Sequence, residues 1–245
     1  MRLEKYLSDC GIGTRSQCKN YIRQGLVRVN DEVIKNGAVQ ISRKDAVQFR
    51  DEPLVLMENL YYMFHKPAGC ICATKDDRQK TVLDYFPKEL SKRLFIVGRL
   101  DKDTEGLLFL TDDGAFVHRL MSPGKHVEKT YYFKALGKLP ENACSMIAAG
   151  MDIGDEKPAK PGKLENIRIE EKDLDSAEWI STGHLTICEG RYHQVKRMIK
   201  RLECEVFYLK RISIGKIMLD ETLQPGEYRA LTDEELQMLG MESRK

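Results

Sequence analysis

An acidic turn at residues 98–106 (Gly-Arg-Leu-Asp-Lys-Asp-Thr-Glu-Gly) is the feature that most constrains the fold of this chain. Apolar residues precede the turn at 94–97 and follow it at 107–110, and both runs are typical of buried β-strands. The sequence Thr-Asp-Asp-Gly at 111–114 predicts a further turn that closes the second strand. Because the core holds both ends of the acidic turn, the turn can fix the position of one side chain, as a catalytic group requires.

Three interpretations of Asp101, Asp103 and Glu105 are open from their spacing. They can be ordinary solvated loop residues. They can also be calcium ligands, because acids at the first, third and fifth positions before Gly106 match the start of an EF-hand loop. Against calcium, the twelfth position is Asp112 instead of a bidentate Glu, and strands flank the loop where an EF-hand has helices. The third interpretation is that Asp101 is a catalytic carboxylate, which requires partners elsewhere in the chain.

Four blocks of the sequence resemble, in order, the motifs of the RNA pseudouridine synthases. They are the block at 65–69 (His-Lys-Pro-Ala-Gly), the acidic turn with the two leucines after it, the block at 127–131 (Val-Glu-Lys-Thr-Tyr) and the block at 189–198 (Glu-Gly-Arg-Tyr-His-Gln-Val-Lys-Arg-Met). The family more often has Asn at the position of His65. The resemblance extends from Arg2 to about Leu231.

The resemblance implies an isomerase that breaks the bond between ribose and uracil, rotates the base and rejoins it through carbon. It implies no metal ion and no cofactor, and the sequence contains neither a GxxxxGK phosphate loop nor an HExxH zinc motif. Asp101 is the implied catalytic carboxylate. It can add to the anomeric carbon, add to the base or assist removal of a ribose proton, and the residues do not distinguish these routes.

The resemblance implies two further catalytic residues, Lys196 and Tyr131. Burial raises the pKa of a carboxyl group, so a catalytic carboxylate needs a nearby cation, and Lys196 stands where the family has Arg or Lys. Tyr131 stands at the position of the tyrosine that stacks on the flipped uracil and is a candidate base for the final proton removal. Strand alternation predicts that Tyr131 and Phe133 share one face and that Tyr132 takes the other.

Positive charge is concentrated in the first fifty residues. They contain ten Lys or Arg and five acids, so this segment carries +5 while the whole chain carries +2, and such a concentration favours a polyanionic partner. A capping box from Thr14 to Gln17 predicts a helix that ends at Gly25. Its exposed face bears the basic stripe, which we define as Arg15, Lys19 and Arg23, and the preceding helix adds Arg2 and Lys5. With the hairpin predicted next, at 26–34, this segment resembles the RNA-binding domain named after ribosomal protein S4.

The predicted fold class is α+β, with an S4-type domain and linker at 1–58 and a larger pseudouridine synthase domain at 59–240. The larger domain is predicted to hold a mixed, mainly antiparallel sheet, with strands at 61–64, 94–97, 107–111, 130–136, 184–188 and 205–214. A helix is predicted at 192–202, and its inward-facing residues are Val195, Met198, Ile199 and Leu202. His193, near its start, is interpreted as a core hydrogen-bonding residue in preference to an RNA contact.

Segment 50–59, which contains Pro53, is predicted to be the linker, and segment 152–175 is predicted to be a surface connection. Within or beside the motif blocks, Arg99, Arg191 and Arg197 are predicted to contact RNA.

The remaining predictions concern partners and location. The chain has neither an apolar stretch of transmembrane length nor a signal-peptide core, and its seven cysteines follow no disulfide or metal-knuckle spacing. We therefore expect a cytoplasmic monomer without a membrane partner. The S4-type domain and the block at 122–131 are most similar to the bacterial branch that modifies ribosomal RNA, so the predicted partner is 16S ribosomal RNA, as free RNA or in a partly assembled subunit. A 23S target is the alternative, and a non-catalytic assembly factor is another, although such a factor would lack at least one of Asp101, Tyr131 and Lys196.

Overall fold

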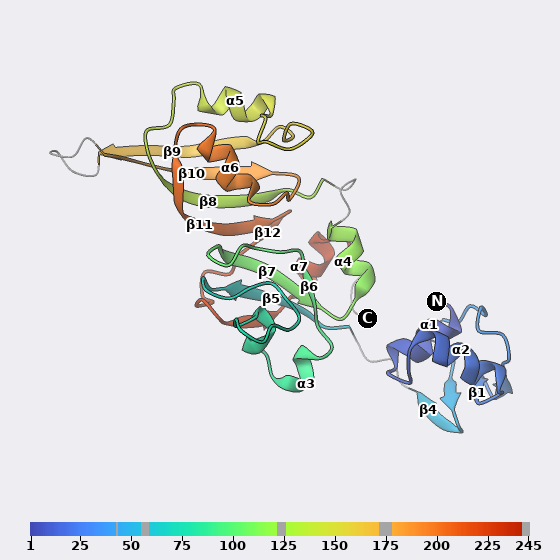
Figure 1. The fold of residues 1–245 in the computed structure, drawn as a ribbon. Helices are drawn as coiled ribbons and strands as arrows, with labels where there is room; N and C mark the ends of the chain where they lie inside the picture. Colours follow the sequence, from blue (N-terminus) through green and yellow to red (C-terminus); the bar gives the residue numbers. More distant parts are fainter. Residues whose placement is uncertain (43, 55–58, 122–125, 172–177, 242–245) are drawn as a thin grey trace. The chain divides into compact units, whose positions relative to one another are not determined.

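The computed structural model describes residues 1–42, 44–54, 59–121, 126–171 and 178–241 (Figure 1). The chain divides into two compact units, Met1–Asn59 and Leu60–Lys245, and the boundary lies one residue after the predicted one. None of the helices in the described ranges has the length and apolar character that crossing a bilayer needs.

The first unit packs two helices on a small antiparallel sheet. Its elements are α1 (Leu3–Asp9), α2 (Arg15–Arg23), β1 (Val27–Val29), β2 (Glu32–Val33), β3 (Val47–Phe49) and β4 (Glu52–Leu54), with the sheet order β2-β1-β3-β4. The predicted capping box is present, because the Gln17 amide donates to the Thr14 hydroxyl while the Gln17 side chain accepts from the Thr14 amide. The helix of the basic stripe therefore begins where its own sequence predicts.

The predicted linker at 50–59 is wrong in its first half, because residues 52–54 form β4. Arg50 and Asp51 take positive φ values of 52° and 66° and make a tight turn that returns the chain onto β3. Pro53 is tolerated because β4 is an edge strand, where a missing amide donor breaks no ladder. Residues 55–58 lie outside the described ranges.

The second unit contains a nine-stranded mixed sheet, so the predicted α+β class is confirmed. The order is β13-β5-β7-β11-β8-β10-β9, with β6 paired to β7 and β12 to β11, and the β7–β11 pair is parallel while the other pairs are antiparallel. Its strands are β5 (Tyr61–Lys66), β6 (Phe95–Val97), β7 (Glu105–Thr111), β8 (Lys129–Leu136), β9 (Lys163–Glu171), β10 (Trp179–Ile187), β11 (Glu205–Ile214), β12 (Ile217–Met218) and β13 (Tyr228–Ala230). Its helices are η1 (Val82–Tyr85), α3 (Lys88–Ser91), α4 (Gly114–Met121), α5 (Ala143–Ala149), α6 (Gln194–Lys200) and α7 (Asp233–Met238).

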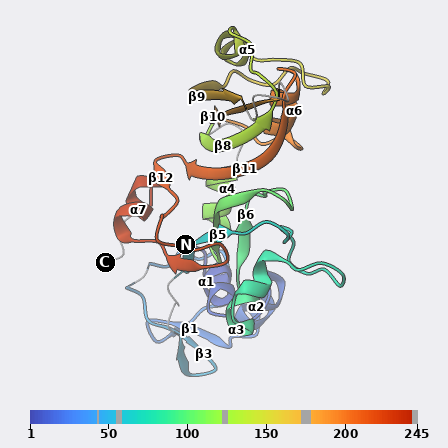
Figure 2. The same ribbon diagram turned by 90° about the vertical axis from the view of Figure 1, so that its left-hand side faces the viewer.

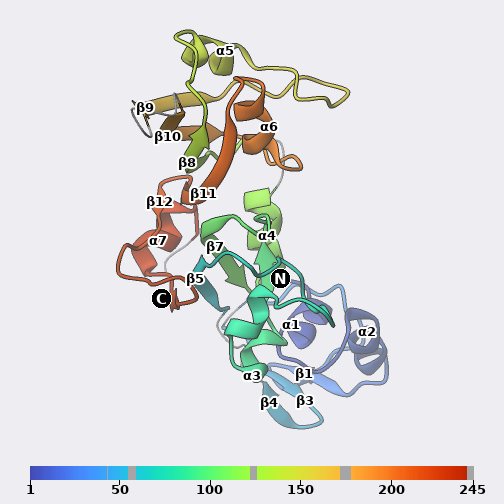
Figure 3. The ribbon, with the colours of Figure 1, turned by 60° about the vertical axis from the view of Figure 1, so that its left-hand side comes forward.

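Strand β7 is buried on both faces, as its uninterrupted apolar run predicts. Leu107 and Phe109 pack into one hydrophobic cluster with α4 and α7, whereas Leu108 and Leu110 pack into another with η1. At the other end of the sheet, α6 lies against β8, β10 and β11, and α5 closes the same cluster (Figures 2 and 3). The acidic turn thus joins a strand that the core holds from both sides.

The surface connection predicted at 152–175 is wrong for its second half, because residues 163–171 form β9 at the edge of the sheet. Leu164 is buried and Ile167 and Ile169 are half-buried, while the charged side chains between them face outward, as is usual for an edge strand. The predicted helix at 192–202 is shorter in the structure, at Gln194–Lys200, but its four predicted inward residues are all buried.

Candidate active site

The acidic turn joins β6 to β7, and Lys66, the last residue of β5, holds it in place through hydrogen bonds. Lys66 is fully buried, and its ammonium group donates to the carbonyl oxygens of Pro67 at 3.0 Å, Lys102 at 3.3 Å and Thr104 at 2.9 Å. The Gly69 amide donates to the same Lys102 carbonyl at 2.8 Å. Burial lowers the pKa of the Lys66 ammonium. One buried cation therefore joins three backbone carbonyl groups from two segments of the chain.

Gly106, at the end of the turn, allows β7 to pack closely against β11. Its φ is +108°, and a Cβ atom at this position would lie 2.2 Å from the backbone oxygen of Arg211 and 2.7 Å from its nitrogen. Backbone atoms cannot move away from such a contact as a flexible side chain can. The close parallel pairing of these two strands therefore requires a residue without a Cβ atom at position 106.

We expect Gly106→Ala to lower the free energy of unfolding by about 3 to 5 kcal/mol, because backbone strain and overpacking add at this position. The matched control is Gly154→Ala, since Gly154 has a φ of +86° but a Cβ atom there would meet nothing within 4 Å. Gly154→Ala should lower the free energy of unfolding by only about 1 kcal/mol. Urea denaturation of both variants tests the prediction, and equal losses would show that close packing against Arg211 is unimportant.

Asp101 lies in the turn with two basic side chains nearby. Its side chain is 29% exposed, and its oxygens lie 3.8 Å from Lys196 Nζ and 3.6 Å from His193 Nε2. Lys196 makes shorter hydrogen bonds, at 2.6 and 2.7 Å, to Asp103. Partial burial acts to raise the pKa of the Asp103 carboxyl, but the hydrogen bond and charge of Lys196 outweigh it, so that pKa lies below its usual value. The structure thus brings Asp101 and Lys196 together and adds Asp103 as a second carboxylate beside the lysine.

The interpretation of His193 as a core residue is wrong. Its side chain is 37% exposed and faces Asp101, because its backbone takes a φ of 50° just before the first turn of α6. This left-handed conformation turns the chain sharply after the loop that follows β10.

The three acids of the turn have different partners. Glu105 accepts a hydrogen bond from the Tyr208 hydroxyl at 2.9 Å, whereas Asp103 binds Lys196 and Asp101 faces His193. In the ranges that the structure describes, no group of three or more His, Cys, Asp or Glu side chains is arranged to hold a metal ion.

A cavity of about 560 Å³ brings the three predicted catalytic residues together, a size suited to a small ligand. Asp101, Tyr131 and Lys196 all line it, and so do Arg99 and Arg191. The prediction for β8 is confirmed: Tyr131 and Phe133 are buried on one face, and Tyr132 lies on the other, where its ring contacts His184 and Tyr208.

Known protein families and proteins are similar to this chain along nearly its whole length. Residues 60–201 match the RNA pseudouridylate synthase family, and residues 1–47 match the S4 domain. The chain belongs to the RNA pseudouridylate synthase family. It is 43% identical over 241 residues to the ribosomal small subunit pseudouridine synthase A of Haemophilus influenzae, covering 98% of this chain and 99% of that protein. It is 42% identical over 241 residues to an uncharacterized RNA pseudouridine synthase of Bacillus subtilis, covering 98% of each. A solved pseudouridylate synthase structure matches with a TM-score of 0.67 and 43% identity, over 98% of this chain and 99% of that one.

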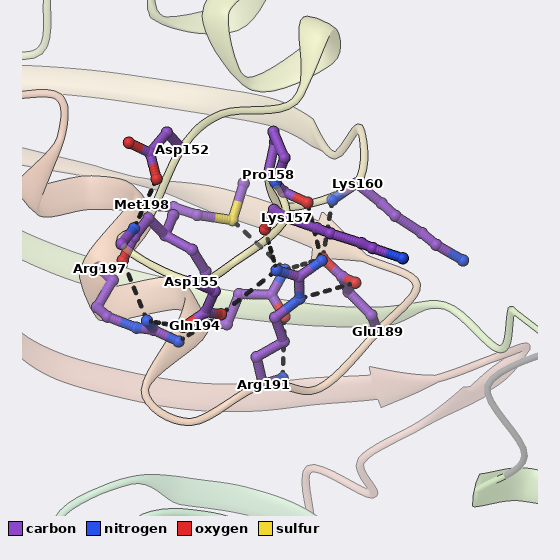
Figure 4. Close-up of polar contacts among 12 residues, drawn as sticks. Asp152, Asp155, Lys157, Pro158, Lys160, Glu189, Arg191, Gln194, Arg197 and Met198 are labelled. Carbon is purple, nitrogen blue, oxygen red and sulfur yellow. Dashed lines mark hydrogen bonds and ion pairs between the residues drawn. The ribbon is translucent and has the colours of Figure 1, made fainter.

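Two of the arginines predicted to contact RNA hold a loop of this pseudouridine synthase in place (Figure 4). Arg197, on α6, donates to Asp155 at 2.7 Å and to the Ile153 carbonyl at 3.1 Å. The hydrogen bond from Arg197 is the main reason why the pKa of Asp155 lies below its usual value. Arg191 binds the same loop and the chain after β10, through Asp155, Glu189 and the carbonyl oxygens of Lys157 and Pro158. These contacts give both arginines a structural role, Arg191 in the lining of the cavity and Arg197 on α6. An RNA contact stays a prediction for both.

The basic stripe of this pseudouridine synthase lies on the exposed face of α2. Arg15, Lys19 and Arg23 are exposed, and no hydrogen bond or ion pair joins their side chains to another residue in the described part of the chain. Arg2 and Lys5 differ, because they approach Glu4 at 3.9 Å and Asp9 at 4.0 Å. Cys18 and Ile22 on the opposite face of α2 are fully buried.

Sequence reasoning did not predict four side chains as part of the site: Lys66, Asp103, Lys129 and Arg211. Arg211 is 3% exposed, and its Nε donates to the Leu107 carbonyl at 2.8 Å. A signal for Arg211 is visible afterwards, since it occupies an inward position of β11 two residues after the buried Leu209, where an unpaired cation is costly. The block at 122–131 can be compared only from 126 onward, because residues 122–125 lie outside the described ranges.

Proposed function

We propose that this pseudouridine synthase converts one uridine of small-subunit (16S) ribosomal RNA to pseudouridine. The observation that carries the proposal is the cavity in which Asp101 lies beside Lys196 and His193, with Tyr131 in the same lining. Support for the substrate comes from relatives named ribosomal small subunit pseudouridine synthase A, at 43% identity in Haemophilus influenzae and 38% in Yersinia pestis, each over 98% of this chain.

In the proposed reaction, Asp101 supplies the carboxylate that acts on the ribose or the base. Lys196, whose ammonium group lies 3.8 Å from it, orients that carboxylate. Tyr131 stacks on the flipped uracil and serves as the candidate base for the final proton removal. Stacking of about 1 to 3 kcal/mol offsets part of the few kcal/mol that flipping the nucleotide costs.

The partner in this proposal is ribosomal RNA, free or in a partly assembled subunit, and the protein acts as a monomer in the cytoplasm. The basic stripe supplies cations without competing acids for the phosphate backbone. Arg99 is exposed at the cavity and is suited to contact the RNA next to the target nucleotide.

The test is release of tritium from uridine labelled at carbon 5, with 16S RNA, 23S RNA and partly assembled small subunits as separate substrates. Release from the 16S RNA or the small subunit alone supports the proposal and shows which form is recognised. Release from 23S RNA alone would replace the small-subunit assignment with the large-subunit alternative. RNA binding without release from any substrate would favour a non-catalytic assembly factor.

We expect Arg15→Glu, Lys19→Glu and Arg23→Glu together to weaken RNA binding by at least about tenfold at moderate salt, because three phosphate contacts are lost. The slope of log affinity against log salt should fall by about 2, following roughly 0.7 per contact for single strands. Filter binding across a salt series measures both quantities. The control carries the same charge change on other exposed cations of the first unit: Lys35→Glu, Lys44→Glu and Arg50→Glu. Equal losses in the two triple variants would mean that overall charge, and not the stripe, binds the RNA.

A further inference from the structure

Arg211 is a buried guanidinium group whose hydrogen bonds are incomplete. It is 3% exposed and lines the cavity. Its Nε donates to the Leu107 carbonyl at 2.8 Å, and its Nη1 lies 3.5 Å from the Tyr131 hydroxyl, at the limit of a hydrogen bond. Its Nη2 has no hydrogen-bond partner in the described part of the chain. A buried donor without an acceptor is uncommon and costly, and a catalytic role is one of the reasons for which such groups are retained.

A second buried cation, Lys129, lies in the same lining. It is 8% exposed, and its ammonium group donates to the Val127 carbonyl at 2.7 Å. Burial and the charge of Arg211 both lower the pKa of Lys129, so the two cations act on each other. Within the described ranges, neither forms an ion pair with a carboxylate, and the basic side chains beside Asp101 are Lys196 and His193 instead. The cavity therefore contains positive charge that the protein itself does not neutralise.

Uncompensated buried charge destabilises a protein by several kcal/mol unless something balances it. Arg211 is 3% exposed, and the pairing of β11 with β7 and β8 fixes its backbone in place. An electron-rich group that enters the cavity would satisfy the free donor and reduce the repulsion between the two cations at once.

We propose that Arg211, with Lys129 beside it, binds a carbonyl oxygen of the target uracil and stabilises the negative charge that the base acquires during the reaction. This inference rests on the proposed function and assigns Arg211 a direct contact with the substrate. Preorganised donors at a site of developing charge are among the largest contributors to enzymatic rate, because they need no reorganisation during the reaction.

The charge balance of the reaction explains why such a site is needed. When the bond between C1′ and N1 breaks, both electrons leave with the base. The ribose either bonds to a carboxylate oxygen of Asp101 or forms a C1′–C2′ double bond after Asp101 takes the 2′ proton. In both cases the negative charge that began on Asp101 ends on uracil, spread over N1 and the two carbonyl oxygens. If Asp101 instead adds to C6, the electron pair of the C5–C6 double bond moves to O4.

The charge is removed when the base rejoins the ribose. C5 donates an electron pair to C1′, Asp101 regains its charge or returns the proton, C5 loses its proton and N1 gains one. Arg211 neither gains nor loses a proton in this sequence. Its expected effect is therefore on the rate of bond breaking and not on the affinity for RNA outside the cavity.

The test compares Arg211→Met and Arg211→Lys with Lys210→Met, which removes a cation from the same strand on the opposite face. We expect the single-turnover rate of pseudouridine formation to fall by at least about 100-fold in Arg211→Met, as for loss of one oxyanion-hole donor. RNA affinity should change by less than about threefold, since most contacts lie outside the cavity. Arg211→Lys should keep more activity than Arg211→Met, and Lys210→Met should remain within about threefold of the parent enzyme.

Two further readouts separate substrate contact from a purely structural role. Substrate RNA with 2-thiouridine or 4-thiouridine at the target should react about tenfold slower with the parent enzyme at one of the two positions, because sulfur is a weaker acceptor for a charged donor. That penalty should vanish in Arg211→Met, which removes the charged donor, if Arg211 binds the replaced oxygen. An unchanged thio penalty in Arg211→Met would overturn the inference, as would a folded Arg211→Met enzyme at the parental rate. If the parent enzyme itself forms no pseudouridine in ribosomal RNA, the proposed function fails instead.

Discussion

Asp101→Asn should abolish pseudouridine formation while leaving the fold and RNA binding intact. The amide has nearly the same shape as the carboxylate, but it carries no charge, is a poor nucleophile and is a poor base. Every route open to Asp101 requires one of those properties, so we expect the single-turnover rate to fall by more than about 10⁴-fold. Tritium release from labelled ribosomal RNA measures the rate. Filter binding measures the RNA affinity of the variant, and thermal unfolding measures its stability.

Asp103→Asn is the matched control for this prediction, because the same turn holds it and the same lysine binds it. Asp103 is largely exposed, and its loss leaves Lys196 free to bind Asp101 alone. We expect a rate change of less than about tenfold, in keeping with the small free energies of exposed ion pairs. Full activity in Asp101→Asn would contradict the proposed mechanism. Loss of activity only in Asp103→Asn would show that Asp103, and not Asp101, is the catalytic carboxylate.

Lys66→Met should destabilise the second unit by about 3 to 5 kcal/mol and reduce activity even in the fraction that stays folded. The substitution removes one buried ammonium and leaves the carbonyl oxygens of Pro67, Lys102 and Thr104 without that donor. Lys102 lies directly after Asp101, so a turn that loses this brace no longer fixes the carboxylate relative to Lys196. Urea denaturation gives the stability, and single-turnover assays at low temperature give the rate of the folded enzyme.

The control for Lys66→Met is Lys102→Met, which removes an exposed lysine from the turn without touching its backbone carbonyl. Its stability should remain within about 0.5 kcal/mol of the parent, as for most surface substitutions. If Lys66→Met were as stable as Lys102→Met, the three carbonyl contacts would contribute nothing to the free energy of unfolding. The flanking strands alone would then determine the conformation of the turn.

The sequence by itself determined the elements whose signals are local. The run at 107–110 predicts a buried strand, and β7 is buried, on both of its faces. Thr14 and Gln17 predict the start of α2, and both hydrogen bonds of the capping box are present. Alternation along β8 predicts that Tyr131 and Phe133 share a face that Tyr132 does not, and Tyr131 and Phe133 are both buried. In each case residues within four positions of one another decide the structure, so one segment carries the whole signal.

Only the tertiary structure decided which distant groups meet. Strands β4 and β9 fell within segments predicted as connections, because edge strands carry Pro and charged residues that strand patterns exclude. Lys66 becomes a brace through carbonyl oxygens up to 38 positions away, and Arg211 reaches Leu107 from 104 positions away. A lysine or arginine has the same local pattern whether it is solvated or buried. Its role depends on the acceptors that the folded chain brings to it. The pairing of β7 with β5 sets those of Lys66, and the pairing of β7 with β11 sets that of Arg211.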